Sequence, residues 1–117
     1  MATQTEQLAQ RHCKPCSGET PALKGNALQE MLGHIEGWEL IEDQKIAKDF
    51  KFKDFRTTLD FVNKVGELAE MEDHHPNICF TWGRCRIELS THKVDGLSEN
   101  DFILAAKIDS LSVALKK

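Results

Sequence analysis

The chain has 117 residues, of which 15 are basic and 19 acidic, and its formal net charge is −4. A chain of this length can bury one hydrophobic core but not two, which excludes a multidomain enzyme. The negative charge and the lack of a basic run exclude a surface that neutralises a phosphate backbone, so we expect no direct nucleic acid binding.

The N-terminal segment is polar and holds no apolar stretch of the roughly 7 to 15 residues that a signal peptide needs. The chain also lacks the roughly 20 consecutive apolar residues of a membrane span. We therefore expect a soluble protein of the cytoplasm that makes no membrane contact. Thiols are kept reduced in that compartment, so we expect no disulfide among the four cysteines, Cys13, Cys16, Cys79 and Cys85.

Residues 1–25 carry Gln, Thr, Lys, Pro, Gly and Ser, with few large apolar side chains. This composition is typical of a flexible N-terminal arm, so we expect the folded domain to comprise residues 26–117. The first predicted element of the domain is a helix with Asn26 as its N-cap and Gly37 as its end. Its apolar face consists of Leu28, Met31, Leu32 and Ile35.

Two predicted strands follow, at residues 38–41 and 45–52, and a turn at residues 42–44 joins them. A long helix is predicted to begin after Asp54, a suitable N-cap. Its apolar stripe, at steps of three and four, consists of Phe55, Leu59, Val62, Val65, Leu68 and Ala69.

The long helix must end near His74, because the residue before a proline is pushed out of the α region and His75 precedes Pro76. Apolar and polar residues then alternate over 78–92, which predicts a hairpin with an apolar face that includes Trp82.

The register of this hairpin depends on its turn. If Gly83 and Arg84 are the two central turn residues, residue 82 lies opposite residue 85. The same register, carried outward, places His75 opposite His92, roughly 5 Å apart at Cβ. The hairpin is therefore predicted to bring two histidines side by side.

A last helix is predicted over residues 98–115, with Ser98 and Asp101 as a capping box and Phe102, Ala105, Ala106, Leu111 and Leu115 as a buried stripe. The order of elements is α-β-β-α-β-β-α. Two hairpins separated by a helix favour an α+β domain, a four-stranded antiparallel sheet with three helices packed on one face.

Three histidines, His74, His75 and His92, are the candidate proton-transfer groups, because imidazole gives and takes protons near neutral pH. Glu70 lies one helical turn before His74, at a spacing where a carboxylate can meet an imidazolium, and Asp101 is a further carboxylate candidate.

Each of these candidate residues could also be present for a purely structural reason. His74 and His75 also suit a helix C-terminus, where the dipole favours positive charge by about 0.3 to 1 kcal/mol. His92 also suits a solvent-facing strand, Glu70 an exposed helix face, and Asp101 a cap alone. A zinc site is disfavoured, because the Cys13-x-x-Cys16 pair has no second pair of ligands.

The residues together resemble a known family. Glu70, His74-His75-Pro76, Trp82, His92 and Asp101 reproduce the spaced pattern of the pterin-4a-carbinolamine dehydratases. The resemblance covers about residues 26 to 115. It also includes Gly37-Trp38, the run from Phe50 to Phe55, the strand end Leu89-Ser90-Thr91-His92 and Gly96-Leu97-Ser98.

The resemblance implies a hydro-lyase that dehydrates a 4a-hydroxy-tetrahydropterin to the quinonoid dihydropterin and so recycles the cofactor of aromatic amino acid hydroxylases. It implies acid–base catalysis without a cofactor or metal, with His74, His75 and His92 as catalytic residues. Pro76, Asp101 and Glu70 would bind the substrate or orient these histidines. A homodimer or homotetramer is also implied.

The family has a second role, since some members act as dimerisation cofactors of a transcription factor or as assembly chaperones. A non-catalytic binding module of the same fold is therefore the alternative function. The retained histidines favour the enzyme. The Cys13-Lys14-Pro15-Cys16 arm and Val94, where animal members carry a cysteine, resemble a bacterial-type member.

Overall fold

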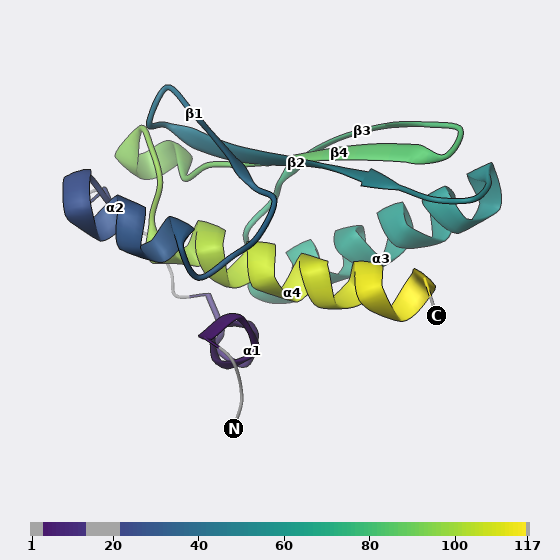
Figure 1. Ribbon diagram of the computed structural model, residues 1–117, viewed down its shortest axis with the longest axis horizontal. Coiled ribbons are helices and arrows are strands. Elements are labelled where there is room, and N and C mark those ends of the chain that lie inside the picture. Colours follow the sequence, from purple (N-terminus) through teal and green to yellow (C-terminus); the bar gives the residue numbers. More distant parts are fainter. Residues whose placement is uncertain (1–3, 14–21, 117) are drawn as a thin grey trace.

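The computed structural model describes residues 4–13 and 22–116. Its four strands form one antiparallel sheet in the order β1-β2-β4-β3, and three helices cover one face of it (Figure 1). The elements are α1 (Gln4–Ala9), α2 (Gly25–Leu32), β1 (Glu39–Ile41), β2 (Lys45–Lys51), α3 (Phe55–Glu72), β3 (Asn77–Thr81), β4 (Arg84–Leu89), the 3-10 helix η1 (His92–Val94) and α4 (Glu99–Lys116).

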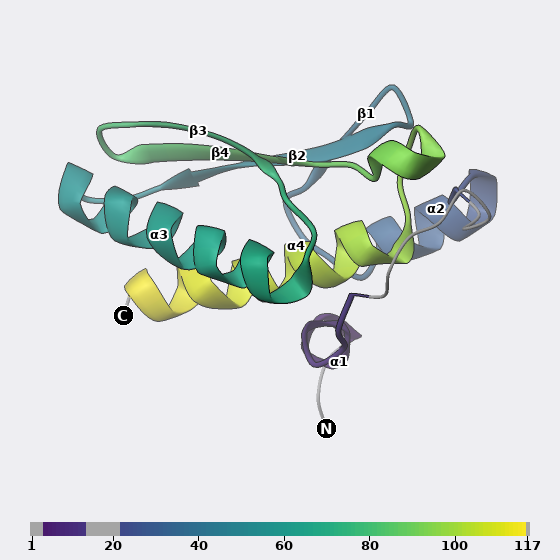
Figure 2. The same cartoon turned by 180° about the vertical axis from the view of Figure 1, so that it is seen from behind.

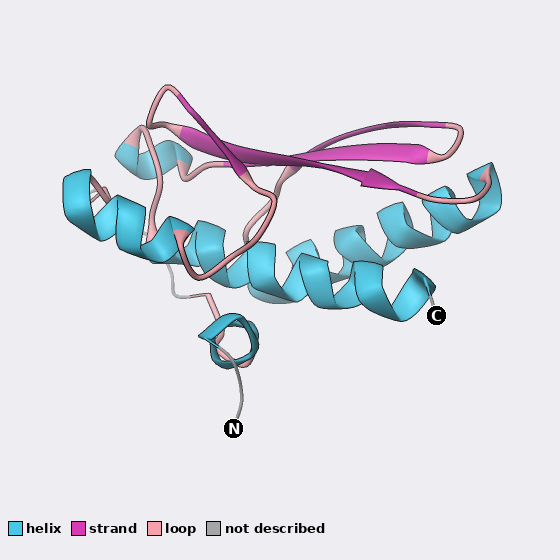
Figure 3. Ribbon diagram, in the orientation of Figure 1, coloured by secondary structure: helices cyan, strands magenta, loops and turns pink. Residues whose placement is uncertain are grey.

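The predicted α+β class and the order of its seven main elements are confirmed. Figures 2 and 3 show the sheet as one layer and α2, α3 and α4 as a second layer against it. The short helix α1 packs on α4 on the side away from the sheet. Among the residues that the structure describes, no α-helix lies on the outer face of the sheet.

The core lies between the sheet and the helix layer. Ile46, Phe50 and Ile87 of the strands meet Phe61 and Val65 of α3, all of them at most 2% exposed. The rings of Phe50 and Phe61 lie 4.9 Å apart between centroids. Burial of each of these side chains contributes roughly 1.5 to 3 kcal/mol, so this interface anchors α3 to the sheet.

Helix α4 is buried on more than the predicted stripe. Phe102, Ala105 and Ala106 are buried as predicted, but Ile103 and Leu104 are buried as well. The reason is that α1 packs on α4 and adds Leu8 to the same core, so α4 is covered on two sides.

The segment expected to be a flexible arm, residues 1–25, contains a short helix in its described part. Residues Gln4–Ala9 form α1, and Leu8 is only 3% exposed. Composition gave no sign of this helix, because a single buried leucine leaves no periodic pattern. Residues 14–21, which include Cys16, lie outside the described residues.

The first domain helix is shorter than predicted. Its N-cap is Lys24 rather than Asn26, and the helix ends before Gly33 rather than at Gly37. Ile35 is nevertheless buried, because the loop after the helix carries it into the core. The apolar spacing therefore identified buried positions beyond the helix itself.

The N-cap of α3 is confirmed, since the Asp54 side chain accepts the Thr57 N–H at 2.7 Å. The helix ends at Glu72, two residues before His74, and Asp73 takes a left-handed conformation with φ of 50°. The His74 N–H then bonds to the Ala69 carbonyl at 3.1 Å, as in a Schellman-type helix end.

The predicted hairpin register is wrong. Thr81 pairs with Arg84, so the two central turn residues are Trp82 and Gly83. Gly83 has a φ of 75°, a conformation that suits glycine and not Arg84. The pairing differs from the predicted one by two positions, which keeps the apolar and polar faces but removes the His75–His92 pair.

Two further expectations fail with that register. Trp82 lies in the turn and is 66% exposed, so it is not part of the core. The strand β4 ends at Leu89, and His92 begins η1 instead of facing β3.

Candidate functional site

Asp101 is the centre of the candidate site. It lies in the first turn of α4, and its side chain is fully buried. Its Oδ2 accepts the backbone N–H of Ser98 at 2.9 Å and the hydroxyl of Thr91 at 2.7 Å. Its Oδ1 lies 2.6 Å from His74 Nε2. The sequence allowed both a capping role and a role beside the histidines, and the two occur together in this side chain.

The direction of these hydrogen bonds follows from the available hydrogens. Thr91 has one hydroxyl hydrogen, and Asp101 as a carboxylate can only accept it. The 2.7 Å contact between Thr91 Oγ1 and Ser98 Oγ is then donated by Ser98. Both hydroxyls are buried, so the carboxylate is held from one side by a chain of two hydroxyls.

His74 is positioned by the end of α3 as well as by Asp101. Its side chain is 11% exposed, and the left-handed residue Asp73 turns the chain so that His74 leaves the helix axis. If Asp101 accepts the Nε2 hydrogen, the neutral ring carries its lone pair on Nδ1. A buried carboxylate thus fixes the tautomer and the ring orientation of His74.

His75 has the opposite environment. Its side chain is 56% exposed, and its Nε2 lies 2.9 Å from Oε2 of Glu70, which is 78% exposed. The expected contact between Glu70 and His74 is thus wrong. It fails because α3 ends at Glu72, so the helical spacing does not continue to His74.

His92 is exposed and lies at the edge of a small cavity of about 210 Å³. The cavity lies between the β1–β2 turn and the segment after β4, and it is lined by Ile41, Glu42, Gln44, Lys45, Ser90, Thr91, His92, Asp95 and Gly96. This volume is below the roughly 300 to 1,000 Å³ of most small-molecule sites, so it suits only part of a ligand.

Thr91 connects the cavity to the buried carboxylate. Its side chain contacts Asp101, and its backbone N–H bonds to the Gly96 carbonyl at 2.7 Å. That bond closes the loop that contains η1. The left-handed conformation of Asp95 ends η1 and turns the chain back toward Thr91. Thr91 therefore lines the cavity and also donates a hydrogen bond to Asp101.

The structure brings some candidate residues together and separates others. His74 contacts Asp101, His75 contacts Glu70, and half-buried Pro76 connects His75 to β3. Sequence reasoning gave Thr91 no role. The available signal was its place in the strand end before His92, and it could not show that the hydroxyl reaches Asp101.

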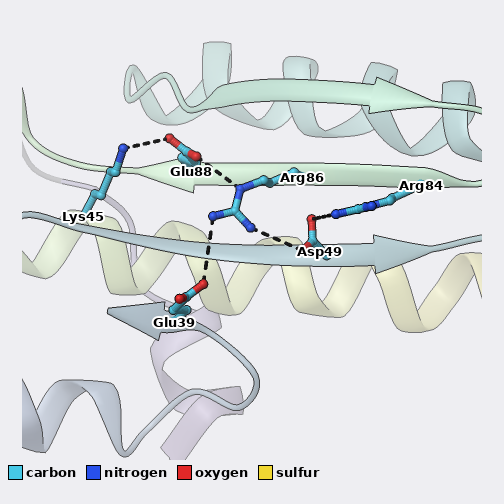
Figure 4. A network of polar contacts seen from close by, with 6 residues as sticks. All are labelled: Glu39, Lys45, Asp49, Arg84, Arg86 and Glu88. Atoms are coloured by element: carbon cyan, nitrogen blue, oxygen red, sulfur yellow. Dashed lines mark hydrogen bonds and ion pairs between the residues drawn. The ribbon is translucent and has the colours of Figure 1, made fainter. Parts of the chain in front are cut away.

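The outer face of the sheet carries paired charges (Figure 4). Arg86 lies 3.3 Å from Asp49 and 3.2 Å from Glu88, and Lys45 lies 3.3 Å from Glu88. Hydrogen bonds from Arg86 and Lys45 hold the pKa of Glu88 below its usual value. Arg84 is also paired with Asp49, at 3.5 Å. These cations are compensated by carboxylates rather than gathered into an anion-binding patch.

The described cysteines are free thiols: Cys13, Cys79 and Cys85. Burial, with Glu72 and Asp101 nearby, raises the pKa of Cys13 to about 12, and burial raises the pKa of Cys85 to about 11. These two thiols stay protonated near neutral pH, which disfavours a nucleophilic role. Over residues 4–13 and 22–116, no three His, Cys, Asp or Glu side chains are grouped so as to hold a metal ion.

The chain is similar to the proteins of one known family. The model of the family described as Pterin 4 alpha carbinolamine dehydratase matches residues 21–111. A Rubrobacter xylanophilus protein with the provisional name pterin-4-alpha-carbinolamine dehydratase is 50% identical over 105 residues, which cover 90% of this chain and 98% of the relative. A Methylococcus capsulatus protein of the same provisional name is 47% identical over 106 residues, with coverage of 90% and 93%.

Two solved structures are also similar. A Brucella melitensis protein described as a transcriptional coactivator/pterin dehydratase has a TM-score of 0.74 and 32% identity, over 78% of this chain and 98% of its own. A pterin dehydratase-like protein described as a RuBisCO assembly factor of the alpha-carboxysome has a TM-score of 0.58 and 25% identity, over 66% and 90%. Within the described ranges, none of the helices has the length and apolar character needed to cross a membrane.

Proposed function

The chain belongs to the pterin 4 alpha carbinolamine dehydratase family, and we propose that it is a hydro-lyase that removes water from a 4a-hydroxy-tetrahydropterin. The observation that carries this proposal is the 2.6 Å contact between His74 and the fully buried Asp101. A buried carboxylate held by three hydrogen-bond partners orients one imidazole and fixes its tautomer, which suits a ring that binds the pterin or passes protons to the other histidines.

The reaction requires two proton movements. An acid donates a proton to the 4a-hydroxyl, the C4a–O bond breaks, and water leaves. A base removes the proton from N5, and the electron pair of the N5–H bond forms the C4a=N5 double bond of the quinonoid dihydropterin. One proton is gained and one is lost, so histidines suffice to balance the step.

We assign proton transfer to His75 and His92, because both side chains are exposed and can exchange protons with a ligand at the surface. His74 binds the pterin or passes protons, held in its tautomer by Asp101. Glu70 orients His75 from the last turn of α3. Pro76 fixes the chain direction between His75 and the start of β3, since its φ is restricted.

The cellular role follows from the reaction. We propose that the protein acts in the cytoplasm, without a bound cofactor, and regenerates the pterin of an aromatic amino acid hydroxylase. A homodimer or homotetramer is supported by large apolar side chains left exposed in the single chain: Phe55, Met71, Phe80, Trp82 and Val113.

The test is the rate at which freshly generated 4a-hydroxy-tetrahydropterin loses water, followed by ultraviolet absorbance. We expect the native chain to accelerate the loss and the double variant His75→Ala, His92→Ala to lose on the order of 10²-fold or more of that rate. The substitution His34→Ala, outside the site, is the matched histidine control. Equal rates for the native chain and buffer would refute the dehydratase.

A second candidate function is that of a non-catalytic binding module, such as an assembly or dimerisation cofactor. It is supported by the similarity to the RuBisCO assembly factor and by the exposed apolar side chains Phe55 and Phe80, whose rings lie 6.1 Å apart. This function predicts that the purified chain shifts the oligomeric state of a partner equally well with and without the substitutions His74→Ala, His75→Ala and His92→Ala.

A further inference from the structure

Residues 4–13 form an N-terminal arm that begins with α1 and ends beside the candidate site. The arm consists of these ten residues. Its helix is anchored by Leu8, which is 3% exposed, and by Lys107 of α4, whose Nζ donates to the Ala9 carbonyl at 2.7 Å. The following residues Arg11, His12 and Cys13 each contact the end of α3 or the start of α4.

Glu72, the last residue of α3, receives this arm. Its side chain is only 4% exposed, although it is a carboxylate. Its Oε1 accepts the Cys13 N–H at 2.7 Å, and its Oε2 lies 2.9 Å from His12 Nδ1. Burial raises the pKa of Glu72, but these hydrogen bonds outweigh burial and hold the pKa below its usual value. The buried carboxylate is thus compensated by the arm.

The arm also contacts the first turn of α4. The Cys13 thiol lies 3.6 Å from the carbonyl oxygen of Asn100, the residue before Asp101. Arg11 forms an ion pair with Glu99, the first residue of α4. The arm therefore contacts the end of α3, two residues before His74, and the start of α4, immediately before Asp101.

We propose that Glu72 is a positioning residue of the site. It docks the arm, and the docked arm holds the end of α3 against the start of α4 so that His74 stays in contact with Asp101. Glu72 acts through these two segments and does not touch the substrate. The catalytic consequence rests on the proposed function, whereas the geometric consequence does not.

The physical reason lies in the origin of the two partners. His74 and Asp101 come from different helices, and their 2.6 Å contact depends on how those helix ends lie relative to each other. A displacement of 1 Å at a reacting group can cost on the order of a hundredfold in rate. A tether across both ends limits such displacement.

The test compares Glu72→Ala and Glu72→Gln with the control Glu67→Ala, which removes an exposed carboxylate from the same helix. Three readouts are measured on the full chain: kcat and KM for the pterin, the downfield imidazole N–H resonance of His74, and the thermal unfolding midpoint. The variant Leu8→Ala weakens the packing of α1 on α4. It takes the place of Glu72→Ala in the test if that variant does not fold.

We expect Glu72→Ala to lower kcat on the order of tenfold, with KM changed less than about twofold, and to weaken the His74 resonance. Glu72→Gln should recover most of both, because its amide oxygen can still accept the Cys13 N–H. Leu8→Ala should act in the same direction, and Glu67→Ala should change neither readout.

An unfolding midpoint that falls while kcat and the His74 resonance stay native would overturn the proposal and leave the arm a stabilising strap. The His74 resonance distinguishes a failure of the proposed function from a failure of the positioning role of Glu72. If the native chain fails to dehydrate the pterin, the proposed function fails, but a resonance lost in Glu72→Ala and kept in Glu67→Ala would still support the positioning role.

Discussion

Two adjacent residues, His74 and His75, have opposite surroundings. His74 is 11% exposed and contacts a carboxylate that is fully buried and held by Thr91 and Ser98. His75 is 56% exposed and contacts a carboxylate that is itself 78% exposed. Both residues follow Asp73, whose left-handed conformation ends α3, but His74 reaches a carboxylate of α4 and His75 reaches one of α3.

The two rings therefore suit two different tasks, although the sequence motif presents them as equivalent neighbours. A ring bonded to a buried, fully hydrogen-bonded carboxylate loses little orientation, which suits the positioning of a substrate or proton path. A ring on the surface can rotate and exchange protons with solvent. Substitutions on the buried side should therefore change both stability and turnover, and those on the exposed side mainly turnover.

The largest effect is expected for Asp101→Asn. The amide keeps one acceptor oxygen for three donors, so at least one buried donor loses its partner, at a cost of about 1 to 3 kcal/mol of unfolding free energy. We expect dehydration to slow by about 10²-fold or more. Urea unfolding and the absorbance assay measure the two effects.

The matched control is Asp109→Asn, on the same helix. Asp109 accepts from Lys48 at 2.8 Å and from Trp38 at 3.0 Å, and burial raises its pKa. Its replacement should lower stability without lowering turnover. If both variants lose turnover equally, the special position of Asp101 is refuted.

Thr91→Val should have the next largest effect. It removes the hydroxyl that Asp101 accepts at 2.7 Å and leaves the Ser98 hydroxyl without its acceptor. We expect a loss of about 1 kcal/mol of unfolding free energy and about fivefold in kcat. Thr91→Ser keeps the hydroxyl and should restore both, and a failure of that rescue would show that the lost hydroxyl alone does not explain the effect of Thr91→Val.

A smaller, pH-dependent effect is expected at Glu72. Its folded pKa is lowered, so its stabilising contribution is present above its unfolded pKa of about 4.3 and is lost as pH falls through the folded pKa. The difference in unfolding free energy between the native chain and Glu72→Gln should therefore be largest at pH 6 to 7, about 1 kcal/mol, and vanish in acid. A difference that grows in acid would contradict this assignment.

The smallest effect is expected for Glu70→Gln. The pair that Glu70 forms with His75 is exposed on both sides, so the unfolding free energy should change by less than about 0.5 kcal/mol. Turnover should fall less than about threefold, because His75 keeps its ring and its access to solvent. A loss as large as that of Asp101→Asn would mean that bound pterin buries this pair.

Much of the fold could be predicted from local patterns. Asp54 was identified as an N-cap because only a few side chains satisfy the first free N–H groups of a helix. The alternation in β3 and β4 gave the correct faces, since side chains point to opposite sides of a strand in turn. Ser98 and Asp101 marked the start of α4 for the same kind of local reason.

The relations between distant segments could not be predicted in this way. The turn at Trp82 and Gly83 and the turn proposed at Gly83 and Arg84 give the same faces, so alternation could not distinguish them. The docking of residues 4–13 depends on one leucine and on hydrogen bonds to Glu72 and Ala9, which leave no periodic signal.

The sequence determined the seven main elements from residue 25 onward, the faces of β3 and β4 and the candidate histidines and carboxylates, because caps and periodicity act over a few neighbouring residues. Only the tertiary structure decided how those side chains pair: His74 with Asp101, His75 with Glu70, and Glu72 with the N-terminal arm. These pairs join segments whose relative position is set by packing of the whole core, and that packing is a property of the complete chain.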